Sequence, residues 1–275
     1  MTDDHRISRF PDAGEDIRRA RVVPDTPQAR SPSYRLAYAD TDFMLRDEMR
    51  PVRLQLELQK AELELSQRGI ESTVILFGSA RIPATEDAGS VRTPGLADLA
   101  RYYDEARRFA MLVTQRSLEH ACCEFVIATG GGPGIMEAGN RGAHEAGGLS
   151  VGLNIVLPHE QVPNRYVTPE LTFSFHYFAI RKMHFLMRAR AVAVFPGGFG
   201  TLDELFESIT LIQTRRMQRV PLILFGRQFW ERIVDWQGLV EVGTISADEL
   251  ELITFVETAD EALAVMDAWN DGRGC

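Results

Sequence analysis

The fold of this chain is indicated most directly by residues 191–204, which read AVAVFPGGFGTLDE. The apolar run over 191–195 predicts a buried strand, and the apolar residues of 202–209 recur at helical spacing. A glycine-rich turn between strand and helix leaves unpaired backbone N–H groups and the positive end of the helix dipole at one point, which suits a phosphate. Glu204 lies inside the first helical turn, where a carboxylate would repel a phosphate. It therefore points to a chemical role beside a phosphorylated substrate.

Composition and charge limit the class of protein. The chain has 275 residues, 45% hydrophobic and 25% charged, enough for one sizeable core or at most two domains. A net charge of −9 argues against a nucleic-acid partner, and no apolar run approaches the ~20 residues of a membrane helix. The N-terminus lacks an apolar signal core, and Cys122, Cys123 and Cys275 fit neither a disulfide framework nor a metal site. We expect a reduced, cytoplasmic, soluble protein without a membrane or metal partner.

The first 70 residues differ from the rest of the chain. Residues 1–41 are rich in Arg, Asp, Pro and Ser without a sustained period, which predicts a mobile arm. Apolar residues recur at helical spacing over 42–70 and predict a long helix, kinked or interrupted near Pro51. We interpret this helix as packing on the domain or on a partner subunit. Residues 71–275 are then a single domain, to which the helix is an N-terminal extension.

The remainder of the chain alternates short apolar runs with amphipathic segments. The runs predict strands at 73–77, 125–128, 150–157, 191–195 and 221–225, with a short last strand at 253–256. Helices are expected at 97–119 and 135–146. Continuous apolar strands that alternate with helices predict a doubly wound parallel α/β sheet with helices on both faces. Ligands of such a sheet bind at the carboxyl ends of the strands.

Three of these strand ends carry glycine, serine or threonine, at 78–79, 129–134 and 197–201. A tight turn would explain any one of them, but their position on one edge of one sheet favours a shared pocket. The common nucleotide fingerprints are absent. No Lys-Ser or Lys-Thr follows the glycines, and Glu137 and Asp203 stand where the dinucleotide pattern has its third glycine. We therefore reject a kinase or NTPase and disfavour a dehydrogenase.

Three segments taken together resemble the LOG (Lonely Guy) family. They are TGGGPGIMEA at 129–138, the Arg181-Lys182 pair, and PGGFGTLDE at 196–204. Members of this family are phosphoribohydrolases of cytokinin nucleotides and related purine monophosphates, often mislabelled lysine decarboxylases. The likeness extends from about residue 73 to the C-terminus. Residues 178–180 differ from the Met-His pattern of plant-type members, which places the chain in a longer, bacterial-looking branch and leaves the preferred base open.

The resemblance implies that Glu204 and Arg181 are catalytic. Cleavage of an N-glycosidic bond passes through a ribosyl cation, which a nearby carboxylate stabilises, and the same carboxylate can activate the attacking water. Glu204 fits both roles, although an acid suits the first turn of any helix. Arg181 would hold the nucleotide or its phosphate through a bidentate fork. Without the resemblance, Arg181 would be interpreted as a solvent-exposed helix residue.

Substrate binding is expected from all three loops. Backbone N–H groups of 197–201 and the Thr201 hydroxyl should bind the 5′-phosphate, while Ser79 and the loop at 130–134 should line the ribose and base. Glu137 either touches the pocket or caps its helix. Lys182 is expected to bind the substrate on the same grounds as Arg181, but these grounds are weaker for Lys182. The predicted substrate-binding residues are Ser79, Gly130, Gly131, Gly132, Gly134, Glu137, Lys182, Pro196, Gly197, Gly198, Phe199, Gly200 and Thr201. The aromatic residues of 173–178 suit a core or dimer interface better than a base-stacking platform.

The resemblance implies that residues 71–275 form a single Rossmann-like nucleotide-binding catalytic domain. It also implies a cofactor-independent hydrolase that forms a homodimer or larger assembly. Its substrate would be a nucleoside 5′-monophosphate, either AMP or a cytokinin riboside monophosphate, and its products a free base and ribose 5-phosphate. The alternative is a non-catalytic carrier of a nucleotide or of the molybdenum cofactor. The Arg181 and Glu204 pair favours the enzyme, because a carrier has no need of it. A lysine decarboxylase is disfavoured, since no set of lysines suits a pyridoxal cofactor.

Overall fold

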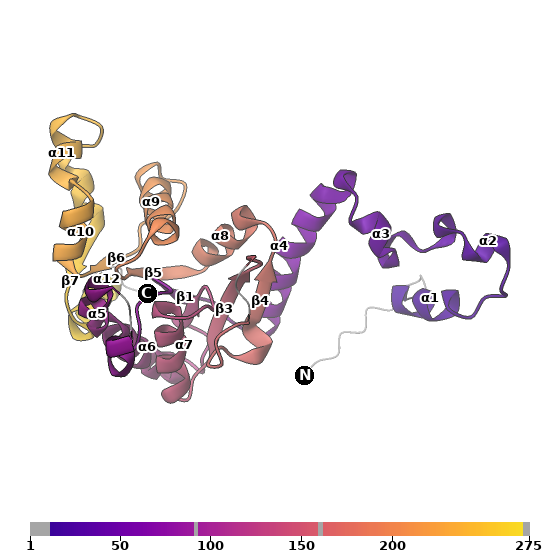
Figure 1. The fold of residues 1–275 in the computed structure, drawn as a ribbon, viewed down its shortest axis with the longest axis horizontal. Helices are drawn as coiled ribbons and strands as arrows, with labels where there is room; N and C mark the ends of the chain where they lie inside the picture. Colours follow the sequence, from indigo (N-terminus) through magenta and orange to yellow (C-terminus); the bar gives the residue numbers. More distant parts are fainter. Residues whose placement is uncertain (1–11, 91–92, 159–161, 272–275) are drawn as a thin grey trace. The chain divides into compact units, whose positions relative to one another are not determined.

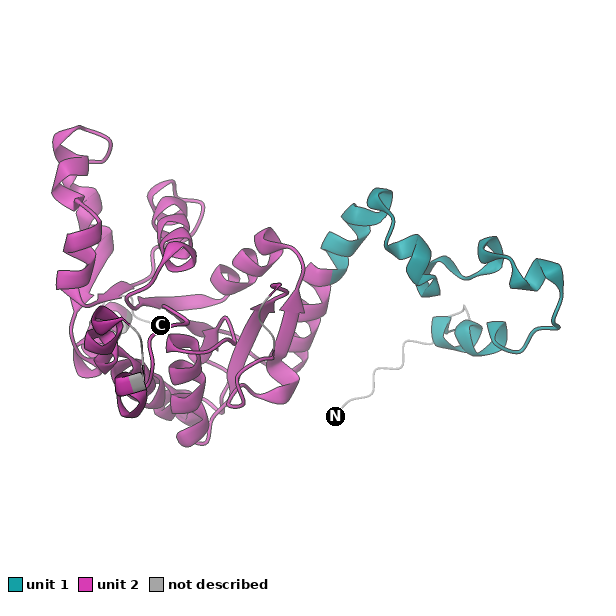
Figure 2. Ribbon diagram, viewed as in Figure 1, with its two compact units in different colours: residues 1–56 teal, residues 57–275 magenta. Residues whose placement is uncertain are grey.

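The computed structural model describes residues 12–90, 93–158 and 162–271. Cys275 and residues 1–11 of the predicted arm lie outside the described residues. The chain divides into two compact units, residues 1–56 and residues 57–275, shown in Figure 2. The division falls inside helix α4 (Arg50–Gln67).

Unit 1 consists of short helices and turns. Its helices are α1 (Ala13–Ala20), α2 (Pro27–Arg30) and α3 (Thr41–Met44), with 3-10 turns at 32–34, 37–39 and 47–49. Asp12, Thr26 and Asp40 cap the three helices by accepting a hydrogen bond from a first-turn N–H. None of these helices has a buried side chain. Regular helix resumes at Arg50, directly before Pro51, where a proline ring meets no earlier turn.

Unit 2 is built on a seven-stranded sheet in which every neighbouring pair is parallel, in the order β4-β3-β2-β1-β5-β6-β7 (Figure 1). The strands are β1 (Thr73–Phe77), β2 (Val126–Thr129), β3 (Ser150–Ile155), β4 (Thr172–Phe175), β5 (Ala189–Val194), β6 (Leu222–Phe225) and β7 (Ile253–Val256). The chain winds outward from β1 to β4, returns to the other side of β1, and winds outward again to β7. The predicted doubly wound parallel sheet is confirmed. Its order reverses between β1 and β5, where sheets of this class bind their ligands.

Helices cover both faces of the sheet. One core contains side chains of α5 (Pro94–Leu99), α6 (Arg101–Glu119), α7 (Ile135–Glu145) and α12 (Ala259–Asp271). The other contains side chains of α4, α8 (Phe178–Met187), α9 (Phe199–Gln213), α10 (Arg227–Ile233) and α11 (Trp236–Glu241). Strand β1 supplies both cores in alternation, with Val74 and Leu76 in the first and Ile75 and Phe77 in the second.

Two elements differ from the sequence-based expectation. The helix expected at 97–119 is interrupted at Ala100, so that α5 and α6 are separate helices. Strand β4 was not expected, because its residues belong to the aromatic cluster at 173–178. Phe173 and Phe175 are buried and Ser174 is exposed, the period of two that a strand requires. The first half of the cluster is therefore core, as expected, but in a strand at the edge of the sheet.

The portion of α4 that belongs to unit 2 holds both ends of α8. The Glu57 carboxylate accepts hydrogen bonds from the backbone N–H groups of residues 176 and 177, at 2.8 and 3.1 Å, just before α8 begins. Glu62 forms a bidentate pair with Arg188, just after α8 ends, with both nitrogen–oxygen distances at 2.7 Å. The Arg188 guanidinium lowers the pKa of Glu62, against the opposing effect of burial. These bonds matter for the site, because α8 carries Arg181 and Lys182.

None of the described helices is long and apolar enough to cross a membrane. Within the described ranges, no group of three or more His, Cys, Asp or Glu side chains is arranged to hold a metal ion. Cys122 and Cys123 are free, half-buried thiols.

Candidate active site

Three glycine-bearing loops meet at the carboxyl ends of β1, β2 and β5. Ser79, after β1, joins them through its backbone. Its N–H donates to the carbonyl of Pro196 at 3.1 Å, and its carbonyl accepts from the N–H of Ile135 at 3.1 Å. The β1 loop is thus bonded both to the β5 loop and to the start of α7. The close approach requires Gly134, which has φ +66°, because a Cβ there would lie 2.4 Å from the Ser79 carbonyl oxygen.

Helices α7 and α9 both begin at this edge, and no side chain caps either of them. The first N–H groups of such a helix have no partner within it, and the helix dipole places positive charge there. At the turn that begins α9, the Phe199 side chain is 93% exposed, and a Cβ at Gly198 or Gly200 would meet no atom within 4 Å. Thr201 is buried and its side chain packs against Gly197. This open turn is suited to an anion such as a phosphate.

A buried ion pair lies between α8 and α9. Arg181 Nη1 is 3.5 Å from Glu204 Oε1, and the two side chains are 11% and 10% exposed. Three further contacts fix the guanidinium. Its Nε donates to the carbonyl of Leu153 at 2.7 Å, its carbon lies 5.0 Å from the centroid of the Phe185 ring, and its Nη2 lies where a Cβ on Gly130 would come within 2.6 Å. Arg181 therefore reaches from α8 to the β2 loop and to α9.

Burial raises the pKa of Glu204 from its ordinary 4.5 to about 7, while the positive charges of Arg181 and Lys182 act in the opposite direction. The desolvation of the carboxylate is the larger effect, so the group titrates near neutral pH. A carboxyl group with a pKa near 7 can both accept and release a proton under physiological conditions.

Lys182 forms a second bridge from α8 to α9. Its Nζ lies 2.9 Å from Asp203 Oδ2 and 2.8 Å from Glu207 Oε2. Burial lowers the pKa of Lys182, but the hydrogen bonds to Glu207 and Asp203 outweigh this and hold the pKa above its ordinary value. The Lys182 ammonium group, expected from the sequence to bind substrate, is thus paired with two carboxylates of α9.

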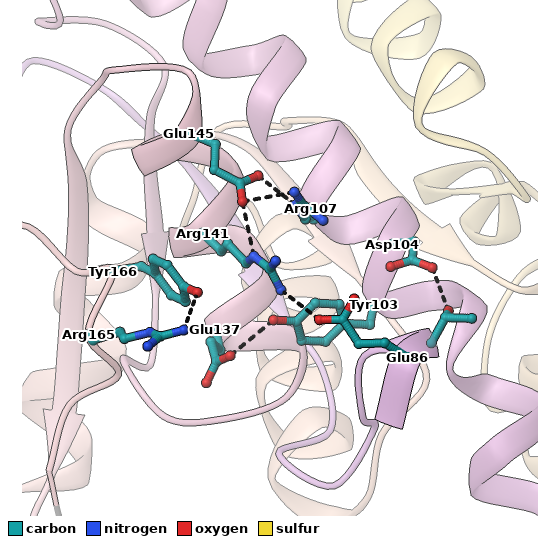
Figure 3. Close-up of polar contacts among 10 residues, drawn as sticks. Glu86, Tyr103, Asp104, Arg107, Glu137, Arg141, Glu145, Arg165 and Tyr166 are labelled. Atoms are coloured by element: carbon teal, nitrogen blue, oxygen red, sulfur yellow. Dashed lines mark hydrogen bonds and ion pairs between the residues drawn. The ribbon is translucent and has the colours of Figure 1, made fainter. Parts of the chain in front are cut away.

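Glu137 lies in the first turn of α7 and faces α6. Its Oε1 accepts a hydrogen bond of 3.0 Å from the Tyr103 hydroxyl. Burial raises the pKa of Tyr103 to about 12, so the phenol keeps its proton and donates. Figure 3 shows that the polar contacts continue along the same two helices, where Glu145 of α7 receives both Arg107 of α6 and Arg141 of α7. Glu137 therefore helps to join α6 to α7 at the edge of the site.

The sequence-based interpretation missed the groups that hold Arg181. Leu153 contributes a backbone carbonyl, which no pattern of side chains reveals. Phe185 stands four residues after Arg181 on the same helix face, a spacing that could have indicated the contact between cation and ring.

Two surface cavities lie away from these residues. One, of about 770 Å³, lies against the turn at 215–219 and residues 246–252; the other, of about 480 Å³, lies between α10, α11 and β7. None of the predicted site residues lines either of them. The candidate site is therefore defined by the uncapped helix ends, the glycine loops and the Arg181–Glu204 pair.

Comparisons with known proteins bear on this arrangement. The model of a family described as "Possible lysine decarboxylase" matches residues 136–266. A probable cytokinin riboside 5′-monophosphate phosphoribohydrolase of rice (Oryza sativa subsp. japonica), LOGL5, is 29% identical over 147 residues. That match covers 52% of this chain and 58% of the rice protein, so the chain spans little more than half the length of this curated relative.

Two solved structures are also similar. The structural-genomics target TM1055 is 19% identical, with a TM-score of 0.48, over 72% of this chain and 99% of that one. A molybdenum cofactor binding protein from the phototrophic bacterium Rippkaea orientalis is 15% identical, with a TM-score of 0.48, over 72% of this chain and 96% of that one.

Fold and site together define a Rossmann-like α/β protein in which an open, uncapped glycine turn lies beside a buried carboxylate. The family match and the rice relative support the resemblance of this chain to the LOG family, which the motifs predicted.

Proposed function

We propose that this protein hydrolyses the N-glycosidic bond of a nucleoside 5′-monophosphate, giving a free base and ribose 5-phosphate. The observation that carries the proposal is the buried Arg181–Glu204 pair, at 3.5 Å, beside the uncapped start of α9. A phosphate at the α9 turn would place the attached ribose within reach of a carboxyl group whose pKa is about 7. The rice relative, named for this reaction on cytokinin ribosides, supports the same chemistry.

The phosphate anchors the substrate in this proposal. Backbone N–H groups of residues 197–201 and the Thr201 hydroxyl receive the 5′-phosphate at the positive end of the α9 dipole. Ser79 and the glycines of 130–134, whose loops are bonded to one another, line the ribose and base. Anchoring at both ends sets the anomeric carbon against Glu204, and such positioning supplies much of the rate enhancement of an enzyme.

Glu204 and Arg181 then act on the reacting atoms. As the bond to the base breaks, positive charge develops on the ribose, and ionised Glu204 stabilises it. The same carboxylate accepts a proton from the water that attacks the anomeric carbon and passes it to the departing base, as the bond to the water oxygen forms and the bond to the base breaks. Arg181 binds the substrate phosphate or the departing base through its guanidinium and keeps part of Glu204 ionised. No cofactor is needed for this reaction, and AMP is our first choice of substrate.

We also propose that the enzyme acts as a homodimer or larger assembly in the cytoplasm. Large apolar side chains are exposed on the two helices that frame the site: Phe178, Met183 and Met187 on α8, and Phe199 at the start of α9. An exposed group of this kind indicates a protein interface. Free thiols at Cys122 and Cys123 suit a reducing compartment. Sedimentation equilibrium of the whole chain, and of a Met183→Glu variant, tests the assembly.

Incubation of the pure protein with AMP, with free adenine followed by chromatography, tests the reaction. We expect turnover that falls at least a hundredfold in Glu204→Ala and in Arg181→Ala, while Glu204→Ala still binds AMP. Glu231→Gln is a matched control, since it changes an exposed helix carboxylate that pairs only with Arg227 among the described residues. Tight binding of nucleotides without release of base, across a panel of purine and pyrimidine monophosphates, would favour the carrier alternative and reject the enzyme.

A further inference from the structure

The glycine loop after β2 is held by an asparagine from a distant part of the chain. Asn164 lies between β3 and β4, and its backbone N–H donates to the carbonyl of Gly131 at 2.8 Å. Its side-chain Nδ2 lies 3.1 Å from the same carbonyl oxygen and 3.0 Å from that of Gly132. The Asn164 Oδ1 in turn accepts the N–H of residue 166 at 3.2 Å, which fixes the side chain. One side chain thus holds two successive carbonyl groups of a site loop.

A buried network behind the loop completes this support. Asn164 Nδ2 also lies 2.9 Å from Asn140 Oδ1, and the same oxygen accepts the Thr129 hydroxyl at 2.7 Å. Thr129 Oγ1 accepts the N–H of Gly131 at 2.9 Å. Asn140 and Thr129 are completely buried. The peptide groups on both sides of Gly131 are therefore bonded, which leaves the loop little freedom to rotate.

Because the peptide bond is planar, the hydrogen bonds to the Gly131 carbonyl also fix the direction of the next N–H group, that of Gly132. In a trans peptide the carbonyl of one residue and the N–H of the next point in opposite directions. Because Asn164 draws the Gly131 carbonyl toward itself, the N–H of Gly132 points away from Asn164. No described residue accepts a hydrogen bond from that N–H. Gly132 is half-buried. Gly130, two residues earlier in the same loop, lies against the guanidinium of Arg181, a residue of the candidate site.

We propose that Asn164 is a positioning residue, which aims the Gly132 N–H at an oxygen atom of the phosphorylated ribose. This inference rests on the proposed function for the identity of the ligand, but concerns binding rather than hydrolysis. The ligand atom is an acceptor, either a ribose hydroxyl or a phosphate oxygen. Asn164 itself stays behind the loop and does not touch the substrate.

Binding of ribose 5-phosphate, which is not hydrolysed, tests the proposal by isothermal titration calorimetry on the whole chain. We expect Asn164→Ala to weaken binding roughly tenfold, the value of about one net hydrogen bond. Asn164→Asp should weaken it at least as much, because a carboxylate would face the carbonyl oxygens of Gly131 and Gly132. The matched control is Ser72→Ala. It removes a hydroxyl group that accepts the backbone N–H of residue 125 at the amino-terminal ends of β1 and β2, away from the candidate site. It should change binding less than twofold.

The amide resonance of Gly132 separates positioning from mere support of the fold. In protein labelled with ¹⁵N-glycine, ribose 5-phosphate should shift this resonance downfield in the wild type and in Ser72→Ala, but not in Asn164→Ala. A Gly132 resonance that does not respond in the wild type, or equal affinities in wild type and Asn164→Ala, would overturn the proposal. Binding with the expected shift but no release of adenine from AMP would instead reject the proposed function and leave this inference standing.

Discussion

Replacement of Glu204 by glutamine should abolish a loss of stability that the wild type undergoes as the pH rises, and the pKa of Glu204 sets the size of that loss. The folded protein raises the pKa of this carboxyl group from 4.5 to about 7. The folded state therefore binds a proton more tightly than the unfolded state, so unfolding becomes easier as the pH rises from 4.5 to about 7. A difference of about 2.5 pH units corresponds to roughly 3 kcal/mol of unfolding free energy, because each unit is worth about 1.4 kcal/mol.

Glutamine resembles the protonated carboxyl group in shape and has no charge at any pH. We expect wild type and Glu204→Gln to have similar pH dependences well below pH 4.5, where Glu204 is neutral in both states. Between pH 5 and pH 8 the variant should gain roughly 2 to 3 kcal/mol of unfolding free energy relative to the wild type. Other groups that titrate over this range cancel in the comparison, since they are the same in both proteins.

Urea unfolding at a series of pH values measures this difference. Tryptophan fluorescence is a suitable signal, because Trp230, Trp236 and Trp269 all belong to unit 2. Parallel stability curves for the two proteins between pH 5 and pH 8 would refute the reasoning, since they would mean that Glu204 has the same pKa in both states. Glu231→Gln serves again as the control, because Glu231 is exposed and should give no such difference.

Three further predictions concern the same residues. If ionised Glu204 is the base, kcat/KM for AMP should rise about tenfold per pH unit below pH 7 and level off above it; a flat profile from pH 5 to pH 8 would contradict this. Gly130→Ala should reduce kcat/KM at least tenfold, because the added Cβ would lie 2.6 Å from Arg181 Nη2, whereas Gly95→Ala, with no atom within 4 Å, should leave it unchanged. Lys182→Met should raise the pKa of Glu204, because the Lys182 charge lowers that pKa in the wild type. The pH–rate profile should then shift to higher pH; an unmoved profile would show that Lys182 acts only as a bridge to α9.

The sequence was sufficient for the inner strands of the sheet because they are buried on both faces. Runs such as 73–77 and 191–195 are continuously apolar, which distinguishes them from the amphipathic helices between them, and parallel strands bring their carboxyl ends to one edge. Strand β4 escaped this reasoning because it lies at the edge and exposes Ser174 between two buried phenylalanines. Four residues with that pattern are too few to tell from the start of a helix.

The candidate site was only partly accessible from the sequence. The motifs indicated which residues to examine, but the 3.5 Å separation of Arg181 and Glu204 depends on how α8 packs against α9. Hydrophobic periodicity determines which helix face is buried, not which neighbour it meets. The raised pKa of Glu204 depends on the same packing, because its largest cause is burial. Asn164 carried no motif at all, since its role comes from backbone carbonyls brought close by the fold.

The bonds between α4 and α8 have a practical consequence for anyone who shortens this chain. A fragment starting at β1 would retain every predicted site residue and the whole sheet. It would also retain the whole part of the sequence that resembles the LOG family. It would nevertheless remove Glu57 and Glu62, leaving two amides at the head of α8 and a guanidinium at its tail without their acceptors. The helix that bears Arg181 would then be free to shift, so the shortest active form of the protein should begin before residue 57.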